Sequence, residues 1–151
     1  MEYRYLGNTG IQVSVFSYGN MMALDTPEGQ KFMTDSIKKS LDMGINYFDN
    51  AEIYGMFTDD GKPEAGRVER MMGKSFKELK VKREEIVIST KLFKIGQKPN
   101  DGFMSRKHII EGCRNSLKRL QLDYVDILFS HRPDYETPLE ETCRAFSWCI
   151  D

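Results

Sequence analysis

Short apolar runs alternate along this chain with longer segments in which apolar residues recur at helical spacing. The short runs contain many β-branched and aromatic residues, which is typical of buried strands. They predict four strands, at Val15–Gly19, Ile45–Phe48, Ile86–Ser89 and Tyr124–Phe129.

Each predicted strand is followed by an apolar stripe at helical spacing. The first helix is expected to begin after Thr26, a good N-cap residue, and to end before Gly44, which suits the residue after a helix. The second helix is expected to open at Pro63 and Glu64. Their stripes are Phe32, Met33, Ile37 and Leu41 in the first helix, and Val68, Met71, Met72, Phe76 and Leu79 in the second.

The last two helices also have start signals. Ser105 is a good N-cap for the third. Thr137 and Glu140 form a capping-box pattern for the fourth, with Pro138 at its first position. The stripes are Ile109, Cys113, Leu117 and Leu120, then Leu139, Cys143, Phe146 and Ile150.

The N-terminal segment predicts a β-hairpin over about residues 3–14. Two apolar runs, Tyr3–Leu6 and Ile11–Val15, flank a turn in which Gly7 and Gly10 suit tight backbone geometry. The hairpin precedes the first strand of the alternating pattern.

The alternation of strand and helix predicts right-handed βαβ units and a parallel sheet. Four such units can begin a doubly wound sheet or a (β/α)8 barrel. No G-x-G-x-x-G sequence follows the first strand, and no G-x-x-x-x-G-K-[ST] sequence occurs. The pattern by itself leaves both architectures open.

Four polar residues stand at or just after predicted strand ends. Asp49, Lys91 and His131 follow strands two, three and four, and Tyr54 lies on the loop after strand two. In α/β barrels, reactive residues gather at the carboxyl ends of the strands. Neighbouring parallel strands lie about 4.8 Å apart, so these residues can meet around one small site.

Acid–base chemistry gives these four residues coherent roles. A lysine ammonium next to a phenol favours the phenolate, so Lys91 can make Tyr54 a proton donor, with Asp49 holding Lys91 in place. His131 can donate a hydrogen bond to a carbonyl oxygen, and the hydride must come from a cofactor. Each residue also has a structural interpretation: an ion-paired lysine, a loop-capping aspartate, a packing aromatic and a backbone-bonded histidine. Spacing alone leaves the two interpretations about even.

Composition excludes several classes of function. The residues are 40% hydrophobic and 30% charged, which is typical of a soluble globular protein. A net charge of -1 gives no general attraction to nucleic acid, and no apolar stretch approaches the roughly 18 residues of a membrane span. The N-terminus also lacks the apolar core of a signal peptide. We therefore expect a cytoplasmic protein without nucleic-acid binding or membrane insertion.

A metal site is not expected. His108 and His131 lie in different segments, and no H-E-x-x-H cluster occurs. His108 stands near the start of the third helix, where a surface position or helix packing is the simplest interpretation.

Several segments resemble the aldo-keto reductase family, in order and over essentially the whole chain. They are Tyr5–Ser14, Asn46–Gly55, Ser89–Lys91 and Ser130–Asp134. Further segments are most similar to the β-subunits of voltage-gated potassium channels within that family, namely Ser105–Gly112, Ser116–Asp126 and Thr137–Thr142.

The resemblance implies NADPH-dependent reduction of aldehydes or ketones on a (β/α)8 TIM barrel. The catalytic residues of the family carry over as Asp49, Tyr54, Lys91 and His131. The cofactor-binding positions that carry over are Asn20 and Met21 at the nicotinamide end, with Asp49 and Lys91. Asn20 stands where the channel subgroup commonly has threonine. His131 stands where channel subunits often have asparagine and where active reductases more often have histidine.

A barrel of this kind has about 250 residues and eight strands. The expectation for residues 1–151 is therefore the N-terminal half of the barrel, with about four parallel strands and their helices. The family's adenosine-phosphate site lies after strand five and is expected to be missing from this chain. The two edge strands, Val15–Gly19 and Tyr124–Phe129, are expected to lack partners, and such edges favour pairing with another chain.

Three hypotheses follow. The first is an NADPH-dependent carbonyl reductase that acts on a small carbonyl substrate and is impaired by truncation. The second is a regulatory subunit that binds the cytoplasmic domain of a potassium channel. The third is a noncatalytic assembly unit whose open edges pair in a homo-oligomer or with a complementing chain.

Overall fold

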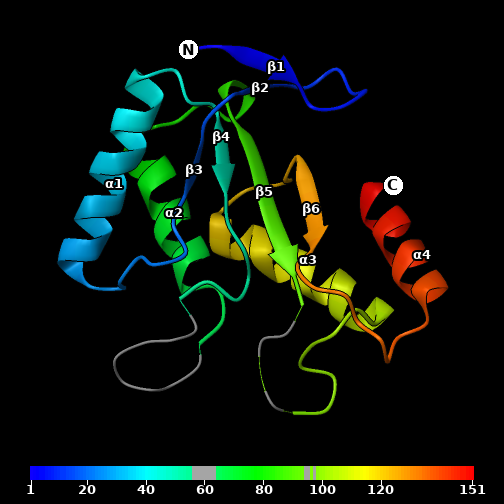
Figure 1. The fold of residues 1–151 in the computed structure, drawn as a ribbon. Helices are drawn as coiled ribbons and strands as arrows, with labels where there is room; N and C mark the ends of the chain where they lie inside the picture. Colours follow the sequence, from blue (N-terminus) through cyan, green and yellow to red (C-terminus); the bar gives the residue numbers. More distant parts are fainter. Residues whose placement is uncertain (56–63, 94–95, 97) are drawn as a thin grey trace.

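A four-stranded parallel sheet with helices along one face forms the body of the molecule (Figure 1). The computed structural model describes residues 1–55, 64–93, 96 and 98–151. The strands run in the order β3-β4-β5-β6, which is also their order in the chain. Their bounds are β3 Ser17–Gly19, β4 Tyr47–Asp49, β5 Val87–Leu92 and β6 Ile127–Ser130.

The helices follow the strands, and each helix packs against the next along the outer face of the sheet. Their bounds are α1 Pro27–Asp42, α2 Arg67–Glu78, α3 Arg106–Leu120 and α4 Leu139–Ile150, with a short 3-10 helix η1 at Arg83–Glu85. Two predicted caps are present: the Thr26 side chain accepts a hydrogen bond from Gly29 N–H, and Ser105 accepts one from His108 N–H.

Two predicted helix starts were wrong. Helix α2 begins at Arg67, after Gly66 in the left-handed region at φ 74°, and not at Glu64, whose carboxylate instead binds the Arg67 and Arg70 side chains. Pro63 lies outside the described residues.

Helix α4 begins at Leu139, and its N-cap is Pro138 without a side-chain cap. The predicted capping box does not form, because the Asp134 carboxylate accepts hydrogen bonds from both the side chain and the backbone N–H of Thr137.

Alternation along the strands gives the sheet two different faces. Phe48 and Ile88 are fully buried against the helices. Phe48 packs edge-on against Phe76 of α2, with ring centroids 5.4 Å apart. Burying an aromatic side chain of this size contributes roughly 2–3 kcal/mol, so this layer fixes the position of β4 and β5. Asp49 and Lys91 point to the opposite face, the inner face of the sheet.

The predicted hairpin is present as β1 (Tyr3–Tyr5) and β2 (Gln12–Ser14), which pair antiparallel. It lies across the amino ends of the sheet, opposite the ends toward which the arrows of β4, β5 and β6 point (Figure 1). Asn46 attaches it: its side chain accepts from Ser14 N–H at 2.8 Å and donates to the Gln12 carbonyl at 3.0 Å. The amino end is therefore closed off, and the carboxyl ends are left for a site.

The strand bounds differ from prediction in one consistent direction. All four strands begin later than their apolar runs, and β4, β5 and β6 also extend further, so that Asp49 and Lys91 are strand residues rather than loop residues. Just before β6, the Asp126 carboxylate accepts hydrogen bonds from the Arg83 side chain at 2.6 Å and from Ile88 N–H at 2.7 Å. These hydrogen bonds delay the regular pairing until Ile127.

Among the described residues the sheet does not close into a barrel, and its edge strands are β3 and β6. None of the helices in this part of the chain is long and apolar enough to cross a membrane.

Candidate active site

The Lys91 ammonium is the centre of a hydrogen-bonded cluster at the carboxyl ends of β4 and β5. Its Nζ donates to Asp49 Oδ2 at 2.6 Å, to the Asn50 carbonyl at 2.7 Å and to Tyr54 Oη at 3.0 Å. An ammonium has three N–H donors, so all of them are used. Lys91 is thereby fixed in one position, with 16% of its side chain exposed.

Asp49 is held from two sides. One carboxylate oxygen binds Lys91, and the other accepts from the Ser89 hydroxyl at 2.5 Å. Ser89 lies two residues before Lys91 on β5 and therefore points to the same face. The carboxylate thus holds the lysine at the position that β5 already gives it.

Tyr54 Oη accepts a hydrogen bond from Lys91, and within the described part of the chain its own O–H has no acceptor, so it can donate to a bound molecule. The ammonium also lies 4.7 Å from the centre of the Tyr54 ring. A positive charge at this position stabilises the phenolate that remains when Tyr54 releases its proton. The geometry therefore suits a tyrosine that donates a proton.

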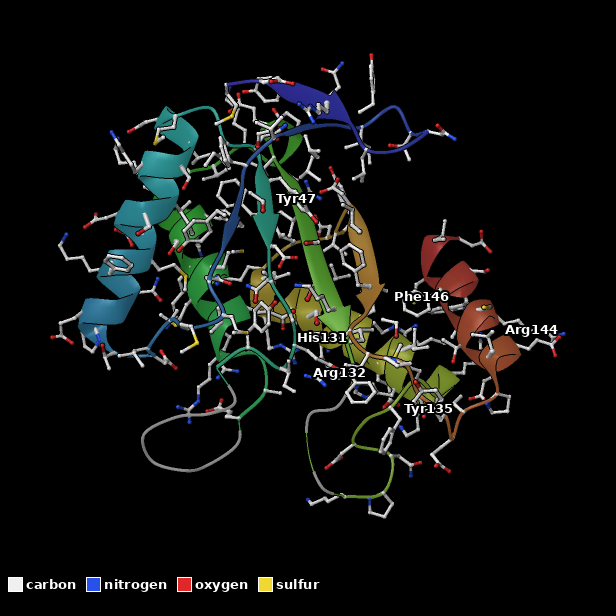
Figure 2. All side chains as sticks on the ribbon, viewed as in Figure 1. Tyr47, His131, Arg132, Tyr135, Arg144 and Phe146 are labelled. Carbon is white, nitrogen blue, oxygen red and sulfur yellow. The ribbon has the colours of Figure 1, made fainter. Side chains whose placement is uncertain are left out.

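His131 lies beside this cluster, at the end of the sheet toward which the strands run, whereas Tyr47 lies nearer the opposite end (Figure 2). Its ring meets the Tyr54 ring edge-on, with centroids 5.8 Å apart. Burial and the nearby Lys91 and Arg132 charges lower the pKa of His131, which outweighs the opposite effect of Asp49 and Glu52. The imidazole is therefore neutral near pH 7, and its buried Nδ1 has no hydrogen-bond partner within the described part of the chain.

A pocket of about 840 Å³ adjoins the cluster. Its lining includes Asn20, Met21, Asp49 and Tyr54, together with apolar residues of the β3–α1 loop and α1. Asn20 is 7% exposed, and its buried side-chain oxygen has no partner among the described residues. An acceptor of this kind fits an amide N–H, which the carboxamide of a nicotinamide ring supplies. Met21 is 58% exposed at the same place.

The structure thus brings Asp49, Tyr54 and Lys91 into direct contact and places His131 against Tyr54. Their catalytic roles stay a prediction, as does the contact of Asn20 and Met21 with a cofactor. Sequence reasoning missed Ser89, although its period-two spacing from Lys91 is a usable signal. It also missed the Asn50 carbonyl, which no side-chain pattern can reveal.

For His108, near the start of the third helix, a surface position or helix packing was predicted, and the surface position was wrong. His108 is 3% exposed, and its Nε2 lies 2.9 Å from Oε1 of Glu52, which is fully buried. Both residues are polar, so a hydrophobic pattern does not mark them as buried, although apolar residues stand beside each of them in the sequence. Their contact joins the loop that carries Tyr54 to helix α3.

Comparison with known proteins gives a consistent result. The Aldo/keto reductase family model matches residues 18–151. Proteins named probable voltage-gated potassium channel subunit beta are 46% identical in Oryza sativa subsp. japonica and 45% identical in Arabidopsis thaliana, over the whole chain in both cases. A putative subunit of the same name in Schizosaccharomyces pombe is 45% identical over 99% of the chain.

Among solved structures, the holo form of an aldo-keto reductase from Bacillus halodurans matches with a TM-score of 0.78 and 30% identity. The match covers 98% of this chain and 46% of that one. The chain likewise spans 42–43% of the length of the three curated relatives. The expected fold, four strands and their helices from one half of a barrel, is confirmed.

Proposed function

The chain belongs to the aldo/keto reductase family, and we propose on that premise that it carries the proton-donating group of an NADPH-dependent carbonyl reductase. The substrates are small aldehydes or ketones, and Tyr54 is the residue that protonates the carbonyl oxygen. Relatives of this chain are more than twice its length, so the activity of the whole protein is part of the proposal.

One observation carries this proposal: the three hydrogen bonds of Lys91. They aim the ammonium at Tyr54 Oη while Asp49 supplies the balancing charge. A purely structural ion pair of Lys91 and Asp49 does not account for a phenol whose hydrogen has no acceptor among the described residues. The same arrangement favours transfer of that hydrogen to an acceptor in the adjoining pocket.

In this mechanism, a carbonyl oxygen lies within hydrogen-bond reach of Tyr54. As negative charge grows on that oxygen, Tyr54 releases its proton to it, and Lys91 stabilises the resulting phenolate. His131, neutral because of its lowered pKa, has an N–H with which to orient the same oxygen. Asp49 balances the charge of Lys91 and holds the side chain in place throughout.

NADPH, when bound, supplies the hydride that reduces the carbonyl carbon. Asn20 and Met21 are proposed to hold its nicotinamide end, beside Asp49 and Lys91. The Asn20 side-chain oxygen supports this assignment, because it lacks a partner among the described residues and is an acceptor in the lining of the same pocket. The proposal also places the chain in the cytoplasm.

The experiment compares NADPH consumption with 4-nitrobenzaldehyde in the wild-type chain, Tyr54→Phe and Tyr135→Phe. Tyr135 is 90% exposed and serves as the matched control, because the substitution removes the same hydroxyl from a side chain outside the set that lines the pocket. Loss of the proton donor is expected to lower the rate about 10²–10⁴-fold, whereas Tyr135→Phe leaves it unchanged. Equal rates in the two variants would refute the role of Tyr54.

A second candidate function is regulatory. The curated relatives are named as potassium channel subunits, which supports association with the cytoplasmic domain of a channel. Co-purification of this chain with such a domain tests it. Tyr54→Phe distinguishes the two functions, since it should leave channel binding intact.

The free edges of the sheet support a third proposal. β3 and β6 each leave one side unpaired among the described residues, so a homo-oligomer or a complementing chain can add strands there. Light scattering of the purified chain separates a monomer from an assembly.

A further inference from the structure

We propose that Glu52 and His108 are positioning residues that hold Tyr54 and Lys91 at the distance at which the lysine ammonium stabilises the Tyr54 phenolate. This inference rests on the proposed function, in which that contact is used for proton transfer. It concerns two residues outside the cluster, neither of which touches the pocket.

The backbone of Glu52 ties the Tyr54 loop to the strand that carries Lys91. Glu52 N–H donates to the Lys91 carbonyl at 3.1 Å, and the Glu52 carbonyl accepts from Gly66 N–H at 2.6 Å. Tyr54 follows two residues later, and its own N–H donates to Ala51 O at 3.1 Å. A shift of Glu52 therefore moves the tyrosine relative to β5.

The side chain of Glu52 adds a second attachment on the other side of Lys91. Oε1 accepts from Phe93 N–H at 2.6 Å, so Glu52 forms hydrogen bonds both to Lys91 and to Phe93, two positions further along the chain. The same oxygen lies 2.9 Å from His108 Nε2, and because Oε1 already acts as an acceptor toward Phe93 N–H, we assign the tautomer in which Nε2 carries the hydrogen and donates. The loop and β5 are thus fixed to each other around Lys91.

His108 fixes this pair to helix α3. The N–H of His108 is held by the Ser105 cap at 3.2 Å, so the imidazole extends from a defined first turn. Gly112, one turn further along α3, leaves the room that the carboxylate occupies: a Cβ there would lie 3.2 Å from Glu52 Oε2. Helix α3 therefore sets where Glu52 can sit.

A second buried acid in the same region provides a comparison. Glu69 is also fully buried and binds Thr90 of β5 at 2.6 Å and Arg119 of α3 at 2.5 Å. Like Glu52, it joins a strand to a helix. It lies on α2, however, and among the described residues it forms no hydrogen bond to the loop that carries Tyr54. A general loss of packing should affect both acids alike, whereas loss of positioning should follow Glu52 alone.

The experiment measures kcat and the KM for NADPH in His108→Leu, His108→Gln and Glu69→Gln. His108→Leu removes the donor to Glu52 and is expected to lower kcat by about 10-fold to 100-fold with little change in KM, as for a small misplacement of reacting groups. His108→Gln keeps an N–H donor and is expected to recover most of that loss. Glu69→Gln is expected to keep kcat near the wild-type value.

Gly112→Ala is a second variant in case His108→Leu does not fold. It adds one methyl group beside Glu52 and improves helix propensity, so a fall in kcat cannot be assigned to a weaker helix. A kcat that is unchanged in both Gly112→Ala and the folded His108 variants would overturn the inference, as would equal losses in Glu69→Gln and His108→Leu.

An NMR measurement separates the inference from the proposed function. The chain has 2 histidines, so His131 gives the only imidazole signal in His108→Leu and His108→Gln. Displacement of Lys91 is expected to change the His131 titration in His108→Leu but not in His108→Gln. If the wild type reduces no carbonyl and this change still appears, the function fails and the positioning stands. If the wild type is active and neither readout moves, the positioning fails and the function stands.

Discussion

Replacing Lys91 by methionine tests the centre of the candidate site. Methionine keeps much of the length of the side chain and removes the charge together with all three hydrogen bonds of Nζ. The free energy of the transition state should rise, because the phenolate of Tyr54 then forms without a cation beside it.

The magnitude follows from the geometry. At 3.0 Å and an effective dielectric constant of about 20, a unit positive charge stabilises a phenolate by roughly 5 kcal/mol. Asp49 lies 2.6 Å from the same ammonium and cancels part of this attraction, and water reaches 16% of the lysine side chain. A net effect of about 2–3 kcal/mol remains, which corresponds to a rate lowered about 10²-fold.

The assay is single-turnover NADPH oxidation with a saturating aromatic aldehyde, with Lys74→Met as the control on the exposed face of α2. Unfolding in urea is followed in parallel by the fluorescence of Trp148, the only tryptophan. Lys91→Met should lower the free energy of unfolding by only about 1–2 kcal/mol, since Asp49 keeps its bond to Ser89 and 26% of its side chain is exposed. A rate equal to that of Lys74→Met would refute the assignment of Lys91.

Three further predictions concern the fold and the site. Phe48→Ala should lower the free energy of unfolding by about 3–5 kcal/mol, because it empties a fully buried ring site between β4 and α2; urea denaturation measures it, and a loss below about 1 kcal/mol would contradict the packing. Asp134→Ala should cost about 1–2 kcal/mol in the same assay, since three backbone N–H groups, of Met104, Glu136 and Thr137, lose their acceptor. The lowered pKa of folded His131 means that the unfolded chain binds its proton at higher pH, so stability should fall as the pH drops below about 6.5, and less steeply in His131→Gln; identical pH slopes in the two proteins would contradict the shift.

Local patterns were sufficient for the order and type of the elements. The caps at Thr26 and Ser105 and the hairpin at the N-terminus are decided by residues close in the sequence, and the structure contains them. The convergence of Asp49, Tyr54 and Lys91 also followed from sequence, because parallel strands place their carboxyl ends at one edge.

Only the tertiary structure decided the features that depend on partners far apart in the chain. Asp134 accepts a hydrogen bond from Met104 N–H, 30 residues earlier in the chain, and this long-range contact fixes the carboxylate that binds Thr137 in place of the predicted capping box. Glu52 and His108 are 56 residues apart, so no local pattern shows that they meet. Burial of that pair follows from the packing of α3 against the sheet, where His108 Nε2 and Glu52 Oε1 bind each other in place of water. A one-dimensional pattern records the polarity of a residue, whereas its hydrogen-bond partner is set by the fold.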